Sequence, residues 1–244
     1  LNEIDMMNLT ETILYSCGIS LFSSFGIQKV EAKRPNILFI MTDQQRYDML
    51  SCAGNRYVHT PSLDQLAENG VRFERNYCAN PVSMPSRFAM ITGRFAGEIG
   101  YTNNSTKPDT LRVLPVVRES SVGNLFRNAG YETIYSGYPG FYCGRTNIED
   151  YGFVQNGTDY YDGPANFAES FFAGYKPEED KPFFLYLSFM NPHDICYGAG
   201  FDPRFPDKLR PHQIAATQKY IDFHKTLSEE EYRNQIPPVP VNME

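Results

Sequence analysis

The segment of residues 81–94 combines residue types and spacings that suit chemistry on an anionic group. Pro85 stands two residues after Ser83 and precedes an apolar-periodic stretch, so Ser83 is predicted to lie at the N-terminus of a helix. Backbone N–H groups and the helix dipole favour an anionic ligand or a charged transition state at such a terminus. Arg87 adds a planar set of donors that suits a tetrahedral oxyanion. The segment therefore predicts an oxyanion site, although Ser83 alone is equally explained as an ordinary helix cap.

Two more polar residues follow apolar runs that are typical of strands. Residues 36–42 form a continuous apolar run before Asp43, which predicts a parallel strand buried on both faces. Residues 183–189 form a second such run, which leads to His193. Open parallel sheets bind ligands outside the carboxyl ends of their strands, so Asp43 and His193 are candidate site residues. Taken singly, Asp43 is equally well a helix cap, and His193 is better explained as a loop residue with satisfied hydrogen bonds.

The remaining pattern alternates between helix and strand. A helix is predicted over residues 60–70, with Thr60 as cap and Gly at the stop, and a strand over residues 71–77. A second helix with the same pattern spans residues 121–130, and a strand over 131–135 follows it. One more helix is predicted over residues 211–225. This alternation indicates an α/β fold.

Composition excludes several classes of protein. The 244 residues are 41% hydrophobic and 21% charged, as in an ordinary globular chain. The net charge of -7, from 29 acidic and 22 basic residues, argues against a basic polyanion-binding surface, and we expect no nucleic-acid partner. The 17 Pro and 18 Gly exclude a coiled coil or a helical repeat. Five widely spaced Cys without a C-x-x-C pair exclude a zinc ribbon and a thioredoxin-like site.

The beginning of the chain predicts an exported protein. The apolar run over residues 13–27 is shorter than the roughly 20 residues that a membrane span needs, so no transmembrane span is expected. Its length suits the apolar part of a signal peptide, and residues 30–32 before Lys33 fit a cleavage site. We therefore predict a leader over residues 1–32 and a periplasmic or secreted location, with lipid anchoring at Cys17 as one form of it. The first twelve residues carry three acidic and no basic residues, which favours the alternative of a disordered leader.

The segment of residues 81–94 resembles the signature of the sulfatases, S/C-x-P-S-R followed by T-G-R, whose first residue is oxidised to formylglycine. Its matching positions are Ser83, Pro85, Ser86, Arg87, Thr92, Gly93 and Arg94. Flanking segments agree with the family at residues 34–44, 60–64, 70–73, 130–133 and 191–193. The resemblance covers nearly all of residues 34–241. It implies an alkaline-phosphatase-like α/β fold, a mostly parallel sheet flanked by helices, that hydrolyses sulfate esters with a calcium ion.

The resemblance also implies a role for each matching residue. Ser83 would be the precursor of formylglycine, whose hydrated form supplies an oxygen nucleophile to sulfur and whose second hydroxyl later expels sulfate. Asp43, Gln44 and the oxygen of residue 83 would bind Ca²⁺. Arg87 would hold the modified residue, and His193 would contact the sulfate or the leaving-group oxygen. A serine in the first position resembles bacterial members that need a radical-SAM maturase. The substrate would be a sulfated small molecule or a glycan.

The sequence departs from a second family signature, G-Y-x-T followed by G-K-x-H. Tyr138 stands where the family has Lys, and Gly140 stands where it has His, unless a few residues are deleted here. A Tyr hydroxyl donates a hydrogen bond but carries no positive charge near neutral pH, so Tyr138 is predicted to bind substrate without adding a cation. By analogy with a lost oxyanion-hole donor, this costs on the order of 10²–10³ in rate.

The family continues beyond this sequence to a strand that completes the calcium site. Residues 33–244 are therefore interpreted as the N-terminal portion of a sulfatase catalytic domain, truncated before its C-terminal part. About three protein ligands would remain where six to eight oxygens are usual, so this chain alone is expected to bind calcium weakly and to be inactive. An incomplete sheet also predicts an open hydrophobic edge and aggregation. A phosphate or phosphonate ester hydrolase of the same superfamily and a degenerate non-enzymatic fragment are the alternatives.

Overall fold

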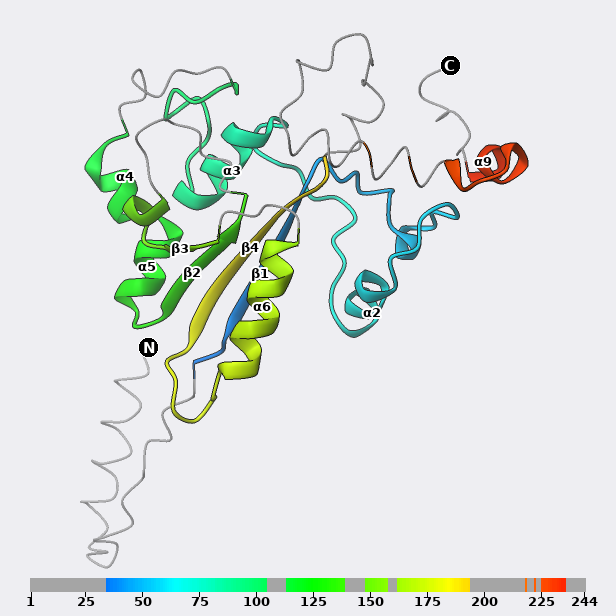
Figure 1. The fold of residues 1–244 in the computed structure, drawn as a ribbon. Coiled ribbons are helices and arrows are strands. Elements are labelled where there is room, and N and C mark those ends of the chain that lie inside the picture. Colours follow the sequence, from blue (N-terminus) through cyan, green and yellow to red (C-terminus); the bar gives the residue numbers. More distant parts are fainter. Residues whose placement is uncertain are drawn as a thin grey trace, which may run out of the picture. The chain divides into compact units, whose positions relative to one another are not determined.

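The computed structural model describes residues 34–104, 113–138, 148–157, 162–193, 218, 222 and 225–235. The fold in Figure 1 is described for the unit of residues 35–244. The predicted leader, Gly140 and most of the helix predicted over 211–225 lie outside the described residues. None of the described helices is long and apolar enough to cross a membrane.

The core of this unit is a parallel sheet in the order β1-β4-β2-β3. Its strands are β1 (Ile37–Asp43), β4 (Phe183–Pro192), β2 (Glu132–Gly137) and β3 (Val154–Asn156). Three of these correspond to predicted strands: β1 and β4 to apolar runs, and β2 to the strand predicted over residues 131–135. Because all pairings are parallel, the carboxyl ends of the strands lie along one edge of the sheet.

Helices cover both faces of the sheet, as Figure 1 shows. Helix α6 (Gly163–Gly174) packs on β2 and β4 from one side, and α5 (Val122–Asn128) packs on β2 from the other, beside α3 (Ser83–Thr92). Successive side chains of a strand point to opposite faces, so β4 serves two clusters. The side chains of residues 183, 185 and 187 pack in a cluster with residues of α6. Those of residues 184 and 186 point to the opposite face and pack in the cluster on the side of α3 and α5. The predicted α/β architecture with a parallel sheet is confirmed.

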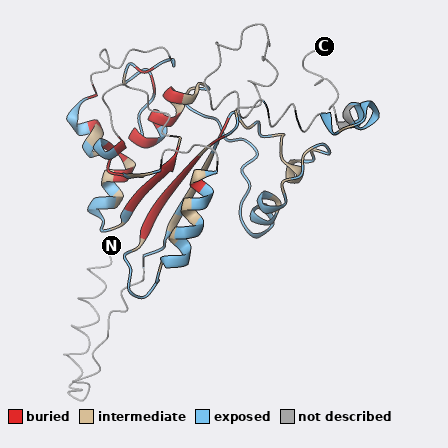
Figure 2. Cartoon of the chain, in the orientation of Figure 1, coloured by how far each residue is buried: buried red, intermediate tan, exposed pale blue. Residues whose placement is uncertain are grey.

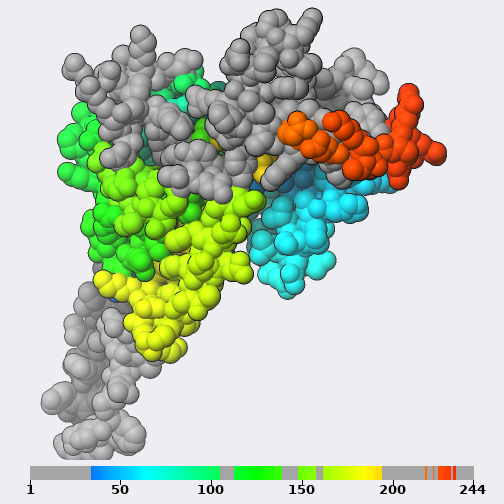
Figure 3. Space-filling view, in the orientation of Figure 1, coloured from blue at the N-terminus to red at the C-terminus, as the bar shows by residue number. Residues whose placement is uncertain are grey.

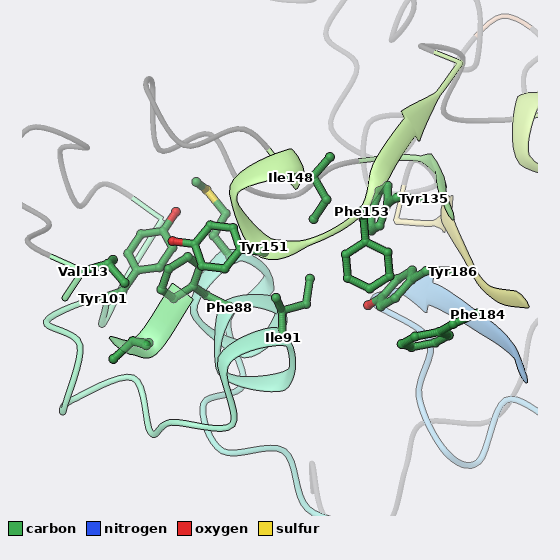
Figure 4. Close-up of a cluster of buried hydrophobic side chains, with 12 residues drawn as sticks. Phe88, Ile91, Tyr101, Val113, Tyr135, Ile148, Tyr151, Phe153, Phe184 and Tyr186 are labelled. Carbon is green, nitrogen blue, oxygen red and sulfur yellow. The ribbon is translucent and has the colours of Figure 1, made fainter. Parts of the chain in front are cut away.

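The larger of the two hydrophobic clusters is rich in aromatic rings (Figure 4). Phe88 of α3 makes edge-to-face contacts with Tyr101 and Tyr151, at ring-centroid distances of 5.4 and 5.3 Å. Such pairs contribute about 0.5–1.5 kcal/mol beyond the area that they bury. Strands β2 and β4 are almost wholly buried beneath this cluster and α6 (Figure 2). The packing therefore fixes α3 firmly against the sheet.

The predicted helices over 60–70 and 121–130 are confirmed as α2 (Pro61–Asn69) and α5. Ser121 occupies the N-cap position of α5 as predicted, but its hydroxyl donates to the carbonyl of Tyr151 instead of capping the helix. Helix α2 buries none of its residues and stands at the surface in cyan in Figure 3. The remaining short elements are η1 (Ser51–Ala53), α4 (Pro115–Glu119), η3 (Ile148–Tyr151) and α9 (Glu229–Gln235).

The prediction that the first strand is buried on both faces is wrong. Strand β1 partly buries one face, and on its other face Leu38 and Ile40 are 44% and 51% exposed. It stands at one end of the described sheet, while α6 packs over β2 and β4. An apolar run is therefore compatible with an edge strand that has one uncovered face.

The strand predicted over residues 71–77 is also absent. These residues form no regular structure, and the side chains of Val71 and Phe73 are 79% and 77% exposed. Strand-forming residues adopt a stable extended pairing only when a neighbouring strand accepts and donates their backbone hydrogen bonds. No described strand pairs with this segment, so its propensity for strand structure has no effect.

Candidate active site

The ends of three neighbouring strands bring predicted site residues together. β1 and β4 are paired so that Asp43 lies opposite Pro192, and His193 follows at once. Tyr138 follows the end of β2, which is the next strand along. An open pocket at this edge is lined by Asp43, Gln44, Ser83 and Arg87, together with His193. The site thus lies where parallel α/β sheets bind ligands.

Ser83 is the first residue of α3, as predicted, and faces the end of β1. Its Oγ donates a hydrogen bond of 3.1 Å to Oδ1 of Asp43. The two residues are 40 positions apart in the sequence, and their contact depends on the packing of α3 against the sheet. The arrangement places a hydroxyl next to a carboxylate that can accept its proton.

The first turn of α3 offers an anion fewer donors than the sequence predicts. The N–H of Met84 donates to Oδ1 of Asn104 over 3.1 Å, and the N–H of Ser86 bonds back to Val82. Pro85 has no N–H. Within the described contacts, the amide of Ser83 is the one remaining donor of this turn, so an oxyanion here depends mainly on side chains.

Arg87 supplies the positive charge of the site. Its Nη2 donates to Oδ2 of Asp43 over 3.2 Å, and its Nη1 donates to Oγ of Ser188 over 2.6 Å. The guanidinium lies 5.0 Å from the centre of the Tyr138 ring. Its Nε has no hydrogen-bond partner among the described residues. A guanidinium that lines the pocket beside a nucleophile can bind an anionic group.

Gln44 has a left-handed backbone conformation, with a φ of 59°. This conformation is uncommon for a residue other than glycine, and strained residues of this kind cluster at functional sites. Gln44 lines the pocket beside Asp43. The turn at the end of β1 therefore directs two oxygen-bearing side chains to the site.

The predicted calcium ligands are of the chemical type that Ca²⁺ prefers, but they are too few to form a full coordination shell. Asp43, Gln44 and Ser83 offer hard oxygen donors, which Ca²⁺ prefers. Both oxygens of Asp43 already accept hydrogen bonds, from Ser83 and Arg87. The described residues contain no group of three or more His, Cys, Asp or Glu side chains that could hold a metal. These residues form at most one side of a cation site.

Tyr138 contacts Arg87 but does not line the pocket. His193 does line the pocket, and its backbone N–H is fixed by the carbonyl of Met190. Tyr138 instead presents its ring to the guanidinium of Arg87. The backbone carbonyl of Tyr138 accepts a hydrogen bond from the hydroxyl of Tyr135.

Tyr135 is itself a buried part of the site. Burial raises the pKa of its hydroxyl to about 12, against the opposing effects of the charge of Arg87 and a hydrogen bond with Ser188. Tyr135 therefore stays a neutral hydrogen-bond donor at any physiological pH.

Two contributors were not identified from the sequence. Ser188 lies within the apolar run of β4, where a fully buried hydroxyl must find a hydrogen-bond partner, and this was a usable signal. Asn104 has no comparable signal, because it lies in a loop twenty-one positions after Ser83 and only the fold brings it to α3.

The pocket thus combines a candidate nucleophile, a carboxylate that can act as a base and an arginine that can bind an oxyanion, which are the groups that ester hydrolysis needs. The Sulfatase family model matches residues 35–230, and the chain belongs to this family. The predicted family and its alkaline-phosphatase-like parallel sheet flanked by helices are thereby confirmed.

Individual relatives agree with this assignment. The chain is 37% identical over 131 residues to an N-acetylglucosamine-6-O-sulfatase of Bacteroides thetaiotaomicron, which covers 53% of this chain and 22% of that protein. It is 40% identical over 106 residues to the uncharacterized sulfatase YidJ of Escherichia coli, covering 43% of this chain and 20% of that protein. The match thus spans about a fifth of each relative's length.

A solved structure shows the same fold. The crystal structure of a putative sulfatase from Bacteroides thetaiotaomicron aligns with a TM-score of 0.56 at 26% identity. The alignment covers 67% of this chain and 37% of that one.

Proposed function

We propose that this chain carries the nucleophile of an enzyme that hydrolyses sulfuric esters. The observation that supports this most directly is the hydrogen bond from Ser83 to Asp43 at the start of α3, beside the buried Arg87. Membership of the sulfatase family gives the reaction class. The chain alone is proposed to be inactive or nearly so, because the described residues provide one side of the site.

Each residue has a distinct role in the proposed reaction. The oxygen of residue 83 attacks sulfur and loses its proton to Oδ1 of Asp43, with which it is already hydrogen-bonded. The S–O bond to the leaving group breaks, and His193, on the same pocket, supplies a proton to the departing oxygen. Arg87 offsets the negative charge of the sulfuryl group.

Oxidation of Ser83 to formylglycine is part of the proposal. A hydrated formylglycine has two hydroxyls on one carbon, so that one attacks sulfur and the other assists release of sulfate. The family's serine-type members suggest a radical-SAM maturase as the partner that makes this modification.

A divalent cation, Ca²⁺, is proposed to share the site, held in part by Asp43 and Gln44. Their oxygens suit a hard cation, and the cation would supply charge stabilisation when bound. A full site needs further ligands than the described residues provide, so weak binding is expected. Calcium titration by calorimetry tests this, with Asp43→Asn as the variant that should weaken binding further.

The proposed substrate is a sulfated glycan or a sulfated small molecule. A relative at 37% identity is named N-acetylglucosamine-6-O-sulfatase, and another at 30% is named N-acetylgalactosamine-6-O-sulfatase. The net charge of -7 disfavours a long polyanion, but a single sulfate group can enter a pocket that holds Arg87.

Mass spectrometry tests the modification. The chain is co-expressed with a serine-type maturase, and the peptide that contains Ser83 is expected to lose two hydrogens. Tyr77→Phe, at an exposed position outside the signature and the pocket lining, serves as the control for Ser83→Ala, which removes the modification site. An unchanged peptide mass after co-expression contradicts formylglycine formation.

Activity tests the reaction class. A version of the protein extended to the length of its relatives is given aryl sulfate and aryl phosphate in parallel. We expect sulfate ester hydrolysis that Ser83→Ala abolishes. A clear preference for the phosphate ester overturns the proposal in favour of a phosphate or phosphonate ester hydrolase.

We also propose that the protein is exported, to the periplasm or the outside of the cell. The support is the apolar run over residues 13–27 and the small residues at 30–32. Fractionation of a fusion that carries residues 1–32 before a reporter is expected to place the reporter outside the cytoplasm. A reporter retained in the cytoplasm contradicts export.

A further inference from the structure

The guanidinium of Arg87 is held from three directions. Asp43 accepts from Nη2 and Ser188 accepts from Nη1, which fixes two edges of the planar group. The ring of Tyr138 lies against its face, with 5.0 Å between Cζ and the ring centre. The side chain of Arg87 is 1% exposed, so water does not compete for these contacts. A cation and an aromatic ring attract each other more strongly when both are shielded from water.

Tyr138 is anchored by its own backbone. Its N–H donates to the carbonyl of Ser188 over 2.8 Å, and its carbonyl accepts from the hydroxyl of Tyr135 over 2.6 Å. Gly137 precedes it with a φ of 102°, and a Cβ there would lie 2.1 Å from the carbonyl oxygen of Ser188. The backbone that carries the ring is thus tied to β4 on one side and to β2 on the other.

These contacts leave Arg87 a defined set of free donors. A guanidinium has five N–H groups, of which two are used here and Nε–H has no partner among the described residues. If the group rotated, the donors that face the pocket would change. A fixed group presents the same donors to every bound oxyanion, which lowers the cost of ordering it during the reaction.

We propose that Tyr138 and Ser188 are positioning residues that hold Arg87 in one orientation. Tyr138 acts through its ring face and Ser188 through its hydroxyl, and neither needs to contact the substrate. This assigns Tyr138 a role other than the direct substrate contact expected from its place in the sequence. The proposal rests on the proposed function for the importance of Arg87, but the held orientation itself is a separate property of the chain.

The orientation can be measured without catalysis. In ¹⁵N-labelled full chain, the Nη protons of a clamped arginine give separate, slowly exchanging signals, because rotation about the Nε–Cζ bond is hindered. The signals of Arg87 are identified by their loss in Arg87→Lys. Aliphatic protons of Arg87 are also expected to shift upfield under the Tyr138 ring.

Matched variants separate the ring from the hydroxyl. Tyr138→Phe keeps the ring and should keep the slow rotation and the upfield shifts. Tyr138→Leu and Ser188→Ala should each speed the rotation by about tenfold or more. Each removes one contact with Arg87, and the free energy of such a contact corresponds to about a factor of ten in rate. Tyr57→Leu and Ser170→Ala, which lie outside the site, are the controls. Circular dichroism confirms folding, and Tyr138→Met replaces Tyr138→Leu if the latter unfolds.

Titration with inorganic sulfate completes the test. Tyr138→Leu is expected to weaken sulfate binding about tenfold, while Tyr138→Phe stays within about twofold. Equal rotation rates in the wild-type chain and Tyr138→Leu would overturn the proposal. Hindered rotation that depends on Tyr138, in a version of the protein extended to the length of its relatives that binds no sulfate, would support the positioning role and count against the proposed function.

Discussion

Arg87 donates a hydrogen bond to Asp43 over 3.2 Å, and the two side chains are 1% and 8% exposed. Asp43 ends β1 and Arg87 lies one turn into α3, so the ion pair joins the sheet to the helix that carries Ser83. A buried pair of this kind adds little net stability compared with apolar side chains of the same size, but loss of one partner leaves an uncompensated charge. Removal of either charge is therefore expected to destabilise the packing of α3 on the sheet as well as to change the charge of the site.

Replacement of Arg87 by Met should destabilise the chain strongly. It leaves the carboxylate of Asp43 buried without its cation, for which we expect a loss of about 3–5 kcal/mol in the free energy of unfolding. Urea denaturation measures this loss. The double variant Arg87→Met with Asp43→Asn should recover part of it. Arg233→Met breaks an exposed pair with Glu229 and should cost less than about 1 kcal/mol. Equal losses in both arginine variants would contradict the argument.

Replacement of Gly137 by Ala should disturb the end of β2. The φ of 102° disfavours any side chain, and the added Cβ would lie 2.1 Å from the carbonyl oxygen of Ser188. We expect a loss of at least about 1–3 kcal/mol in stability, together with the loss of slow rotation of Arg87.

Gly174→Ala is the matched control for this variant. A Cβ at Gly174 meets no atom within 4 Å, and the residue lies in α6. Alanine there should be neutral or stabilising, by up to about 1 kcal/mol. Thermal unfolding of both variants gives the comparison, and a Gly137→Ala chain as stable as the wild type would show that β2 adapts to the side chain.

Elements that depend on a local residue pattern were predictable from the sequence. The apolar runs of β1 and β4 predicted strands, and Pro85 predicted the start of α3 at Ser83. The alternation of helices and strands predicted a parallel sheet, in which Asp43 and His193 lie at the same edge. These features follow from residue type and spacing alone.

Features that depend on the neighbours of an element were not predictable in this way. Whether β1 is covered on both faces depends on where α6 packs, and whether residues 71–77 form a strand depends on a partner. The contacts of Tyr138 and Ser188 with Arg87 join residues 51 and 101 positions apart. Such contacts are properties of the assembled sheet, and no local pattern encodes them.

The hydroxyl of Tyr135 should ionise at a higher pH in the folded chain than in the unfolded chain. Burial raises its pKa to about 12, so the folded state binds this proton more tightly than the unfolded state, whose Tyr ionises near 10. The stabilisation is present below pH 10 and is lost as the pH rises from about 10 to 12. Absorbance at the tyrosinate band should show exposed Tyr ionising first and a later phase that Tyr135→Phe diminishes. A single phase near pH 10 in the folded chain would contradict the burial argument.

The uncovered face of β1 should promote self-association. Leu38 and Ile40 are about half exposed on a strand at one end of the described sheet, and exposed apolar strands associate with other chains. Replacement of both by Thr places a polar β-branched side chain at each position. It should reduce aggregation, seen by light scattering, at a cost below about 1 kcal/mol in stability, because little buried area is lost. Leu185→Ala, at a fully buried position of β4, should cost about 2–5 kcal/mol and increase aggregation through unfolding. If the double Thr variant aggregates as fast as the wild type at equal stability, the exposed face of β1 is not the surface responsible.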